Sequence, residues 1–170
     1  MKYWLTTDTH FNHGAIKEYC GRPDDYEERI LKGLCSIPHN DVLIHLGDVC
    51  LGKDEEMHKH FIKPFSYKKI LVRGNHDKKS DNWYLAHGWD WVCKTMEIER
   101  MGKRILFSHR PMVWNGYWTI NIHGHFHNTN HRRDEPGMNR DLLAGQHLLA
   151  LEYNNYKPWI LDSILEKAND

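Results

Sequence analysis

The sequence lacks an excess of charge of either sign, because 23 lysine and arginine residues balance 23 aspartate and glutamate residues. A basic surface for extended nucleic acid is therefore not indicated. The sequence also lacks any run of about 18 apolar residues, the length that a transmembrane helix needs. The apolar stretch at its N-terminus, residues 1–5, is too short for a signal peptide. These absences predict a soluble, cytoplasmic protein with no membrane association.

Cysteine is scarce, and the four residues Cys20, Cys35, Cys50 and Cys93 lie far apart without a C-x-x-C pair. We interpret them as reduced thiols that pack like small hydrophobic side chains, because disulfides are rare in reducing compartments. Internal repeats, low-complexity tracts and linkers are also absent. A chain of 170 residues with these properties predicts a single domain over residues 1–170 with its own core.

Apolar, β-branched segments alternate with amphipathic segments in the first half of the chain. The pattern predicts strands over residues 2–7, 42–46 and 69–73. It predicts helices from Asp24 or Asp25 to Pro38, over 54–65 and over 82–87. Because strands and helices alternate, we expect a mostly parallel sheet.

The second half of the chain has a different pattern. Residues 91–100 and 104–108 are typical of a β-hairpin across Met101-Gly102-Lys103. Further strands are predicted over 119–122 and 148–153, and a helix over 159–167 that starts after Pro158. Residues 131–146 are polar and turn-rich and show no clear pattern. The whole chain predicts two facing sheets with helices outside.

Histidine is abundant, with 14 residues, and many of them lie in short polar clusters. Five clusters are of interest, four of them at or just after the end of an apolar run: Asp8-Thr9-His10, Gly47-Asp48, Gly74-Asn75-His76-Asp77, Ser108-His109 and His123-Gly124-His125-Phe126-His127. Side chains that follow parallel strands converge at one edge of a sheet. We therefore expect these clusters to form one site.

The donor groups in these clusters predict a site for two metal ions. Asp8 and His10 are two residues apart, as are His125 and His127, and in an extended chain such residues point to the same side, roughly 6.5 Å apart. Two such pairs with a carboxylate between them can surround cations about 3.5–4 Å apart. Carboxylate, amide and imidazole groups together suit Mn²⁺, with Fe or Zn²⁺ as alternatives, better than Mg²⁺.

The charges of such a site favour a phosphate substrate. Asp8 and Asp48 neutralise only half of the charge of two divalent cations, and a bridging hydroxide neutralises part of the rest. The remaining positive charge attracts a phosphoryl group, and the hydroxide is the nucleophile. His76 is the candidate that assists the leaving oxygen, because imidazole can donate a proton near neutral pH.

These clusters resemble the motifs of the calcineurin-like metallophosphoesterase superfamily, and most closely those of small single-domain phosphoesterases of microbes and their viruses. The similarity covers nearly the whole chain and includes the segments 8–13 and 151–158. It implies an α/β fold, a four-layer α/β/β/α sandwich of two mixed sheets flanked by helices.

The resemblance also implies roles for individual residues. One metal ion would be held by Asp8, His10, Asp48 and His127. The second would be held by Asp48, Asn75, His109 and His125, with Asp48 shared between the two ions. The predicted catalytic residues are His76, which would lie over the substrate phosphate, and Asp48.

The chain departs from the protein Ser/Thr phosphatases of that superfamily, which read Gly-Asp-x-x-Asp-Arg-Gly and Gly-Asn-His-Glu. Here Gly47-Asp48 is followed by Val49-Cys50-Leu51-Gly52, and the second motif ends in Asp77. The carboxylate that orients the catalytic imidazole in those enzymes is therefore absent. These departures favour a phosphodiesterase or a small-molecule phosphatase over a phosphoprotein phosphatase.

Other polar residues are weaker candidates. Four are predicted substrate contacts: His13, Arg22, Arg110 and His123. An arginine can hold a phosphate oxygen, although it can equally form a surface salt bridge, and the same alternatives apply to Arg73. The aromatic segment 114–118 could stack on a base or pack in the core. His45 lies in an apolar run, and we interpret it as a hydrogen-bonded structural residue.

The predicted function is hydrolysis of a phosphodiester or small phosphomonoester, with a small phosphate ester or nucleotide as substrate. A nuclease that acts on single-stranded nucleic acid is one alternative, although the balanced charge of the chain argues against it. A non-catalytic, metal-dependent binding module is the other. Asn75 and His76 argue against that alternative, because a structural metal site needs no acid beside it.

Overall fold

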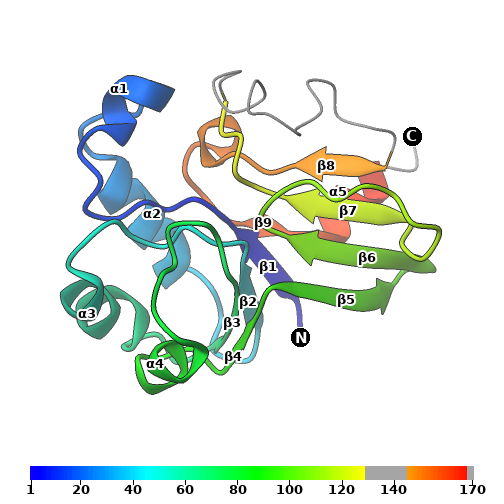
Figure 1. Cartoon of the computed structure of the whole chain (residues 1–170), viewed down its shortest axis with the longest axis horizontal. Helices are drawn as coiled ribbons and strands as arrows, with labels where there is room; N and C mark the ends of the chain where they lie inside the picture. The colour runs from blue at the N-terminus through cyan, green and yellow to red at the C-terminus, as the bar shows by residue number, and fades with distance from the viewer. Residues whose placement is uncertain (129–144, 168–170) are drawn as a thin grey trace.

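Two β-sheets form the centre of the computed structural model, which describes residues 1–128 and 145–167 (Figure 1). The first sheet has the strand order β4-β3-β2-β1-β9, and the second has the order β5-β6-β7-β8. The strands are β1 Tyr3–Thr6, β2 Val42–His45, β3 Lys68–Val72, β4 Trp91–Cys93, β5 Thr95–Arg100, β6 Lys103–Ser108, β7 Ile120–His123, β8 Gln146–Leu148 and β9 Trp159–Ile160. The predicted α/β arrangement of two mixed sheets with helices is confirmed.

Parallel pairing joins β1 to β2, β2 to β3 and β3 to β4, as the alternation of strands and helices predicted. Strand β2 is buried along its whole length because both faces of the sheet are covered. Leu43 packs in the outer hydrophobic cluster beside the helices, whereas Ile44 packs in the cluster between the sheets. At the opposite edge, β9 pairs antiparallel with β1.

The helices on the outer side of the first sheet are α1 Ile16–Cys20, α2 Tyr26–Cys35, α3 Asp54–Met57 with the π-helix η1 His58–Ile62, and α4 Asp81–Ala86. In α2, Tyr26, Ile30 and Leu34 lie four residues apart and are buried, which is the pattern of an amphipathic helix. The prediction of one helix over 54–65 is wrong in part, because the α-helix α3 ends at Met57 and a π-helix follows from His58 to Ile62. Helix α1 was not predicted.

A two-residue turn forms the predicted hairpin between β5 and β6. Met101 and Gly102 both have positive φ, 51° and 71°, as a tight hairpin turn between twisted strands requires. The prediction of one strand over 91–100 is wrong, because Lys94 separates β4 in the first sheet from β5 in the second. Both halves are extended, so the sequence pattern does not reveal that the chain changes sheets here.

The C-terminal predictions also need correction. Strand β8 ends at Leu148, and the 3-10 helix η2, Leu151–Asn154, replaces the predicted strand over 148–153. The predicted helix over 159–167 starts two residues later, as α5 Leu161–Lys167, because β9 uses the first two residues to pair with β1. Most of the segment 131–146 lies outside the described residues.

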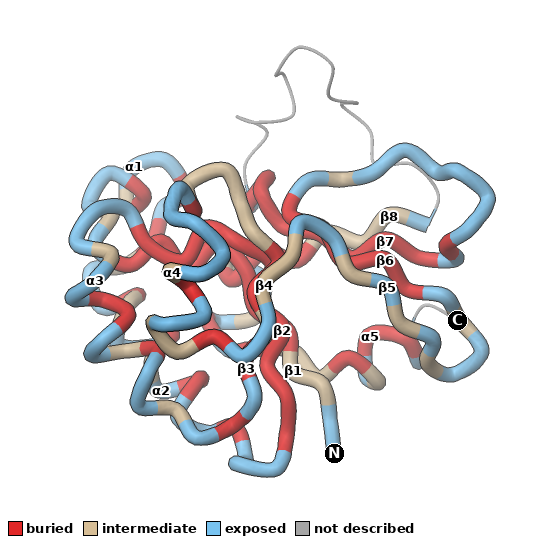
Figure 2. Tube along the Cα trace, turned by 60° about the horizontal axis from the view of Figure 1, so that its bottom comes forward, coloured by how far each residue is buried: buried red, intermediate tan, exposed pale blue. Residues whose placement is uncertain are grey.

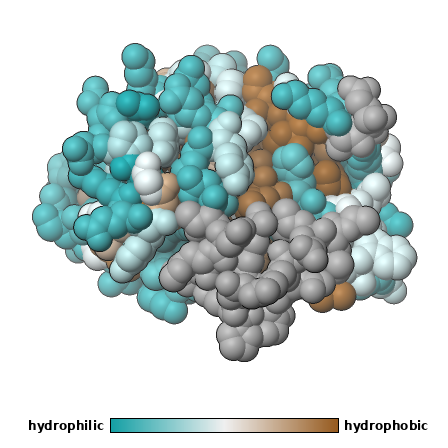
Figure 3. All heavy atoms as spheres, turned by 90° about the horizontal axis from the view of Figure 1, so that it is seen from above, coloured by the Kyte–Doolittle hydropathy of each residue, from teal (hydrophilic) through white to brown (hydrophobic). Residues whose placement is uncertain are grey.

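Two hydrophobic clusters hold these layers together. One lies between the first sheet and α1 to α4, and the other lies between the sheets and includes Leu161, Ile164 and Leu165 of α5. Buried segments accordingly run through the middle of the molecule (Figure 2). Seen from above, the helical half is mostly hydrophilic, and apolar side chains gather over the other half (Figure 3). Within the described ranges, none of the helices is long and apolar enough to cross a bilayer.

Candidate metal centre

The loops that follow five strands meet at one edge of the two sheets. Asp8, Asp48 and Asn75 follow β1, β2 and β3, while His109 and His125 follow β6 and β7. Backbone hydrogen bonds join the loops in pairs: the N–H of Asp8 donates to Gly47 O at 2.8 Å, and the N–H of Gly124 donates to His109 O at 3.0 Å. The structure therefore brings the five predicted clusters together, as expected for the carboxyl ends of neighbouring strands.

Five of the predicted ligand residues have left-handed backbone conformations: Asp8, His10, Asp48, His125 and His127, with φ between 46° and 74°. A residue other than glycine in this region costs of the order of 1–3 kcal/mol when its surroundings force it there. Ten described residues other than glycine have positive φ, and five of them are these residues. Such strain clusters at active sites, so its presence in five of the seven predicted ligand residues supports their selection as site residues.

Glycines allow the loops to approach each other closely. A Cβ atom at Gly74 would overlap the backbone N and Oδ1 of Asp48, and one at Gly124 would overlap Oδ2 of Asp8 and Oγ1 of Thr7. Only glycine fits at such contacts. Both carboxylates are therefore held against backbone on the side that faces away from the site.

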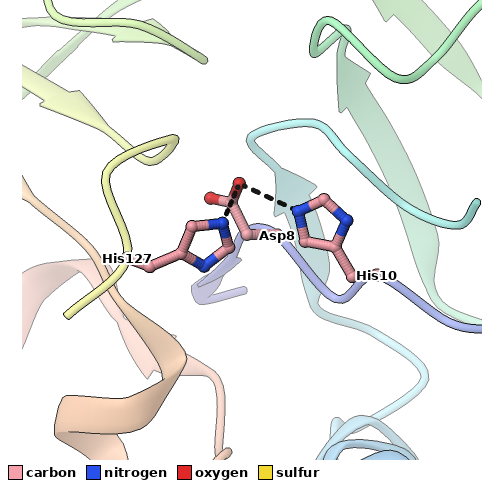
Figure 4. A group of neighbouring side chains, drawn as sticks. All are labelled: Asp8, His10 and His127. Atoms are coloured by element: carbon pink, nitrogen blue, oxygen red, sulfur yellow. Dashed lines mark ion pairs between the residues drawn. The ribbon is translucent and has the colours of Figure 1, made fainter. Parts of the chain in front are cut away.

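The first donor group consists of Asp8, His10 and His127, whose side chains point toward one another (Figure 4). Asp8 Oδ1 lies 3.7 Å from His10 Nε2 and 3.6 Å from His127 Nε2. Asp8 Oδ2 accepts hydrogen bonds from Thr7 Oγ1 and from the backbone N–H of His125. The other oxygen, Oδ1, is buried and has no hydrogen-bond partner among the described residues.

The second donor group consists of Asp48, His109 and His125. His109 Nε2 lies 3.1 Å from His125 Nδ1, 3.0 Å from Asn75 Oδ1 and 3.3 Å from Asp48 Oδ2. His109 Nδ1 is 2.7 Å from the carbonyl oxygen of Leu46. Because a carbonyl only accepts, Nδ1 carries a proton, and in the neutral imidazole Nε2 presents its lone pair to the site, which is the usual arrangement of a metal-binding histidine.

Asp48 lies between the two groups. Its Oδ2 is 3.7 Å from His10 Nε2 and 3.3 Å from His109 Nε2. Its Oδ1 accepts a hydrogen bond of 2.7 Å from the backbone N–H of His76. One oxygen of the carboxylate therefore holds the loop after β3, which contains His76, and the other oxygen faces both donor groups.

The donor groups fit a pair of divalent cations. Bonds of about 2.1 Å to a common ion place two ligand atoms about 3.0–3.6 Å apart, depending on the coordination angle. The distances around Asp8 Oδ1, 3.6 and 3.7 Å, lie at and just above the upper limit of that range. A buried carboxylate oxygen that lacks a hydrogen-bond donor and faces two imidazole nitrogens is suited to a cation.

Asp77 fixes the two loops that carry Asp48 and His76. Its Oδ2 accepts from the backbone N–H groups of Asp48 and Gly74 at 2.8 and 2.7 Å, and its Oδ1 accepts from Val49 N–H at 3.1 Å. In the sequence this residue belongs to the cluster Gly74-Asn75-His76-Asp77 and marks a departure from a family motif. Its side chain binds backbone N–H groups and positions the loop that contains His76, a role that its sequence neighbours do not reveal.

Arg22 and Glu152 support the first donor group from behind. Arg22 Nε donates to Glu152 Oε1 at 2.8 Å, and its Nη2 donates to the carbonyl oxygen of Asp8 at 2.8 Å. Glu152 Oε1 also lies 3.6 Å from His127 Nδ1. The side chain of Arg22 is fully buried, so the structure favours a positioning role for Arg22 over the predicted contact with substrate.

His76 lies at the surface of the site. Its side chain is 25% exposed, and its Nε2 is 3.9 Å from Asp48 Oδ2. Its ring centroid is 5.4 Å from that of His10 and 6.3 Å from that of His13. His13 is partly exposed, and its Nδ1 is 3.3 Å from His10 Nδ1. Both histidines are thus accessible to a molecule that enters the site.

The remaining predicted residues lie in different environments. Arg110 is exposed beside His109, whereas His123 is fully buried at the end of β7, which argues against its predicted contact with substrate. His45 is structural, as interpreted: Gly47 N–H donates to its Nδ1, so its Nε2 donates to Thr9 Oγ1. In the aromatic segment, Trp118 is buried, while Trp114 and Tyr117 in the same segment are exposed.

Nearby carboxylates favour protonation of two histidines of the site. Burial lowers the pKa of both His109 and His127, but nearby carboxylates overcome it. The hydrogen bond and charge of Asp48 raise the pKa of His109 to about 9. The charge of Asp8, with Cys20 and Glu152, raises the pKa of His127 to about 10. Without cations, both imidazoles are therefore positively charged at neutral pH, and a metal ion must displace one proton from each of them.

We expect the stability of the chelated protein to fall as pH rises from 7 to 10. The folded-state pKa values of His109 and His127, about 9 and about 10, exceed the unfolded value of about 6.5. Their contribution to stability is therefore complete below about pH 6.5 and is lost as pH rises through the folded values. Thermal unfolding of the chelated protein over this range measures the effect.

The variant His127→Asn provides the control, because it removes one of the two protonated groups and should flatten the dependence. Added cations should restore more stability at pH 9 than at pH 7, since fewer protons must then be displaced. A melting temperature of the chelated protein that stays constant or rises between pH 7 and 10 would contradict the expectation.

The fold and these donor groups are those of a metal-dependent phosphoesterase. The family model for calcineurin-like phosphoesterases matches residues 1–161. The chain therefore belongs to the calcineurin-like phosphoesterase family, whose members use divalent metal ions.

Two similar proteins match almost the whole length of this chain. An uncharacterised protein of Methanocaldococcus jannaschii is 30% identical over 176 residues, which cover 97% of this chain and 90% of that protein. The crystal structure of a protein of unknown function from Aquifex aeolicus is 28% identical, with a TM-score of 0.76 over 97% of this chain and 98% of that one. A structure described as a novel archaeal phosphodiesterase is more distant, with 15% identity and a TM-score of 0.43. The match covers 73% of this chain and 72% of that one.

Proposed function

We propose that this protein hydrolyses a phosphodiester or a small phosphomonoester of nucleotide type with the help of two divalent cations. Asp8, His10, Asp48 and His127 would hold one cation, and Asp48, Asn75, His109 and His125 would hold the other. The position of Asp48 carries the proposal. A single oxygen, Oδ2, faces both donor groups at 3.7 and 3.3 Å, as a shared ligand of two neighbouring ions must.

The cations, when bound, supply Lewis acidity to phosphoryl oxygens and lower the pKa of water so that a nucleophile forms near neutral pH. The side chains of the protein supply position and proton transfer. Asp48 Oδ1 fixes the backbone of His76, so that the partly exposed imidazole stays over the site. Its Nε2 can then donate a proton to the leaving oxygen of an ester bound there.

The donor set favours particular ions. Four imidazoles, two carboxylates and one amide in the two groups suit Mn²⁺, Fe or Zn²⁺, whereas Mg²⁺ prefers oxygen ligands and water. We propose Mn²⁺ as the first ion to test. The histidine-rich set also means that the protein should bind the ions more weakly at low pH, where protons compete for the same nitrogens.

The proposed function is tested with bis-p-nitrophenyl phosphate, p-nitrophenyl phosphate and adenosine 2′,3′-cyclic phosphate. Chelated protein should be inactive toward all three, and added Mn²⁺ should restore turnover of at least one. Turnover that survives complete removal of metal would contradict the mechanism. A folded, metal-loaded protein that is inert toward a broad panel of phosphate esters would favour the binding-module alternative instead.

A labelled single-stranded oligonucleotide completes the panel. The proposal expects cleavage of the small esters to be faster than cleavage of the polymer. Rapid cleavage of the polymer, weakening steeply as salt rises, would identify a nuclease, because contacts along a phosphate backbone release counterions.

A further inference from the structure

A cavity of about 560 Å³ lies beside the second donor group. Asn75 and His109, which belong to that group, form part of its wall. The rest of the wall comes from the end of β3, the crossing between the sheets and the loop after β6, and includes Arg73, Lys94, Arg110 and Met112. The cavity is therefore continuous with the candidate metal centre.

The charges in this wall have one sign. Arg73, Lys94 and Arg110 are basic, and among the described residues the lining contains no aspartate or glutamate. Asp81, which pairs with Arg73, lies outside the lining. This local excess contrasts with the balanced total of the chain, 23 basic and 23 acidic residues. A concave site lined by charges of one sign raises the local concentration of ligands of opposite charge.

Arg73 is held in place at this wall by other residues. Its Nη1 donates to Asp81 Oδ1 at 2.8 Å, and its Nη2 donates to the backbone oxygen of Asp77 at 2.7 Å. Its Nε is buried and has no hydrogen-bond partner in the described part of the chain. The guanidinium is thus held in a fixed orientation by Asp81 and the backbone of Asp77 before any ligand arrives.

The cavity extends from one side of the metal centre only. Its wall includes Asn75 and His109 but does not include His10, His13 or His76. His76, the residue proposed to assist the leaving oxygen, lies instead near His10 and His13. A diester bound at the metal centre would direct its leaving arm toward His76 and its retained arm toward the cavity.

We propose that the cavity binds a second phosphate group on the retained arm of the substrate, so that the preferred substrate is a phosphodiester that also carries a phosphomonoester. This proposal rests on the proposed function. A terminal phosphate carries close to two negative charges near neutral pH, and lysine and arginine are its usual partners in proteins. The three basic side chains of the wall match such a group in charge.

Two esters with the same leaving group test the proposal: thymidine 5′-(p-nitrophenyl phosphate) and the same compound with a 3′-phosphate. Release of p-nitrophenolate by the Mn²⁺-loaded protein gives kcat/KM for each. We expect a preference of about tenfold or more for the compound with the 3′-phosphate, since charged hydrogen bonds to phosphate are the strong ones. The preference should appear mainly in KM.

The variants Lys94→Met and Arg110→Met should each reduce this preference several-fold, and the double variant should abolish it. Lys59→Met is the matched control, because Lys59 is exposed on η1 and is not part of the cavity wall. A preference near one in the unchanged protein, or a preference that both variants retain, would overturn the proposal while leaving the proposed function intact.

A binding experiment separates the two hypotheses if neither ester is hydrolysed, a result that would contradict the proposed function. The metal-loaded protein should bind thymidine 3′,5′-bisphosphate more tightly than thymidine 5′-phosphate, by about tenfold in Kd. Lys94→Met should reduce this difference several-fold, and the double variant with Arg110→Met should remove it. Equal affinities for the two nucleotides would refute the second phosphate site regardless of activity.

Discussion

Replacing Asp48 with asparagine should lower the turnover of bis-p-nitrophenyl phosphate by about a thousandfold or more. Asparagine keeps the oxygen that accepts the 2.7 Å hydrogen bond from His76 N–H, so the loop should hold its conformation. It replaces Oδ2, the atom between the donor groups, with an amide nitrogen that cannot bind a cation. Metal ions contribute several kcal/mol to stabilising the charge of the transition state, and about 1.4 kcal/mol corresponds to tenfold in rate.

Two measurements check this expectation. Initial rates at saturating Mn²⁺ give the loss of turnover, and metal analysis should find fewer ions per chain than in the unchanged protein. Asp24→Asn is the control, because Asp24 is exposed and pairs only with Lys17 in the described structure. If Asp48→Asn retained both its ions and its turnover, Asp48 would not be a shared ligand.

The variant His76→Gln should show an effect that depends on the leaving group. For a diester with an alkyl leaving group we expect kcat to fall by about 10²–10⁴, the usual contribution of a general acid. For a p-nitrophenyl ester the loss should be less than about tenfold, because p-nitrophenolate leaves without a proton. Comparison of kcat for the two esters in both proteins measures the effect.

His60→Gln is the matched control for this variant, because His60 is an exposed histidine on η1, away from the donor groups. It should change neither rate. An equal loss with both leaving groups in His76→Gln would show that the imidazole binds or stabilises the phosphoryl group rather than protonating the leaving oxygen.

The sequence predicted the framework of the site because local patterns determine it. Four of the five polar clusters follow the end of an apolar run, and parallel neighbours place those ends at one edge. Asp8, Asp48 and Asn75 could therefore be expected to meet, and the structure brings them together with His109 and His125. Their role as ligands stays a prediction that metal analysis will test.

The supporting residues could not be predicted, because their partners are distant in the sequence. Asp77 binds backbone N–H groups 28 and 29 residues earlier, and Arg22 pairs with Glu152, 130 residues later. Asp77 in isolation has the pattern of a turn residue, and Arg22 that of a surface cation. Only the fold shows that both are buried behind the donor groups.

The misassigned elements have a similar cause. A strand is recognised in sequence by its apolar, extended pattern, but its partner is not. Residues 91–100 keep that pattern across Lys94 although the chain there leaves one sheet for the other. Trp159 and Ile160 have the pattern of a helix start, but they complete the edge of the first sheet beside β1.

The pairing of β9 with β1 has a consequence for biosynthesis. Strand β1 leads into the loop with Asp8 but receives its edge partner from residues 159 and 160. Glu152, which supports His127, is also made late. A chain still attached to the ribosome at residue 130 would contain every proposed ligand but not the segments that hold the first group in place. Acquisition of metal should therefore follow synthesis and folding of residues 152–160, and contacts between such distant residues should make maturation slow.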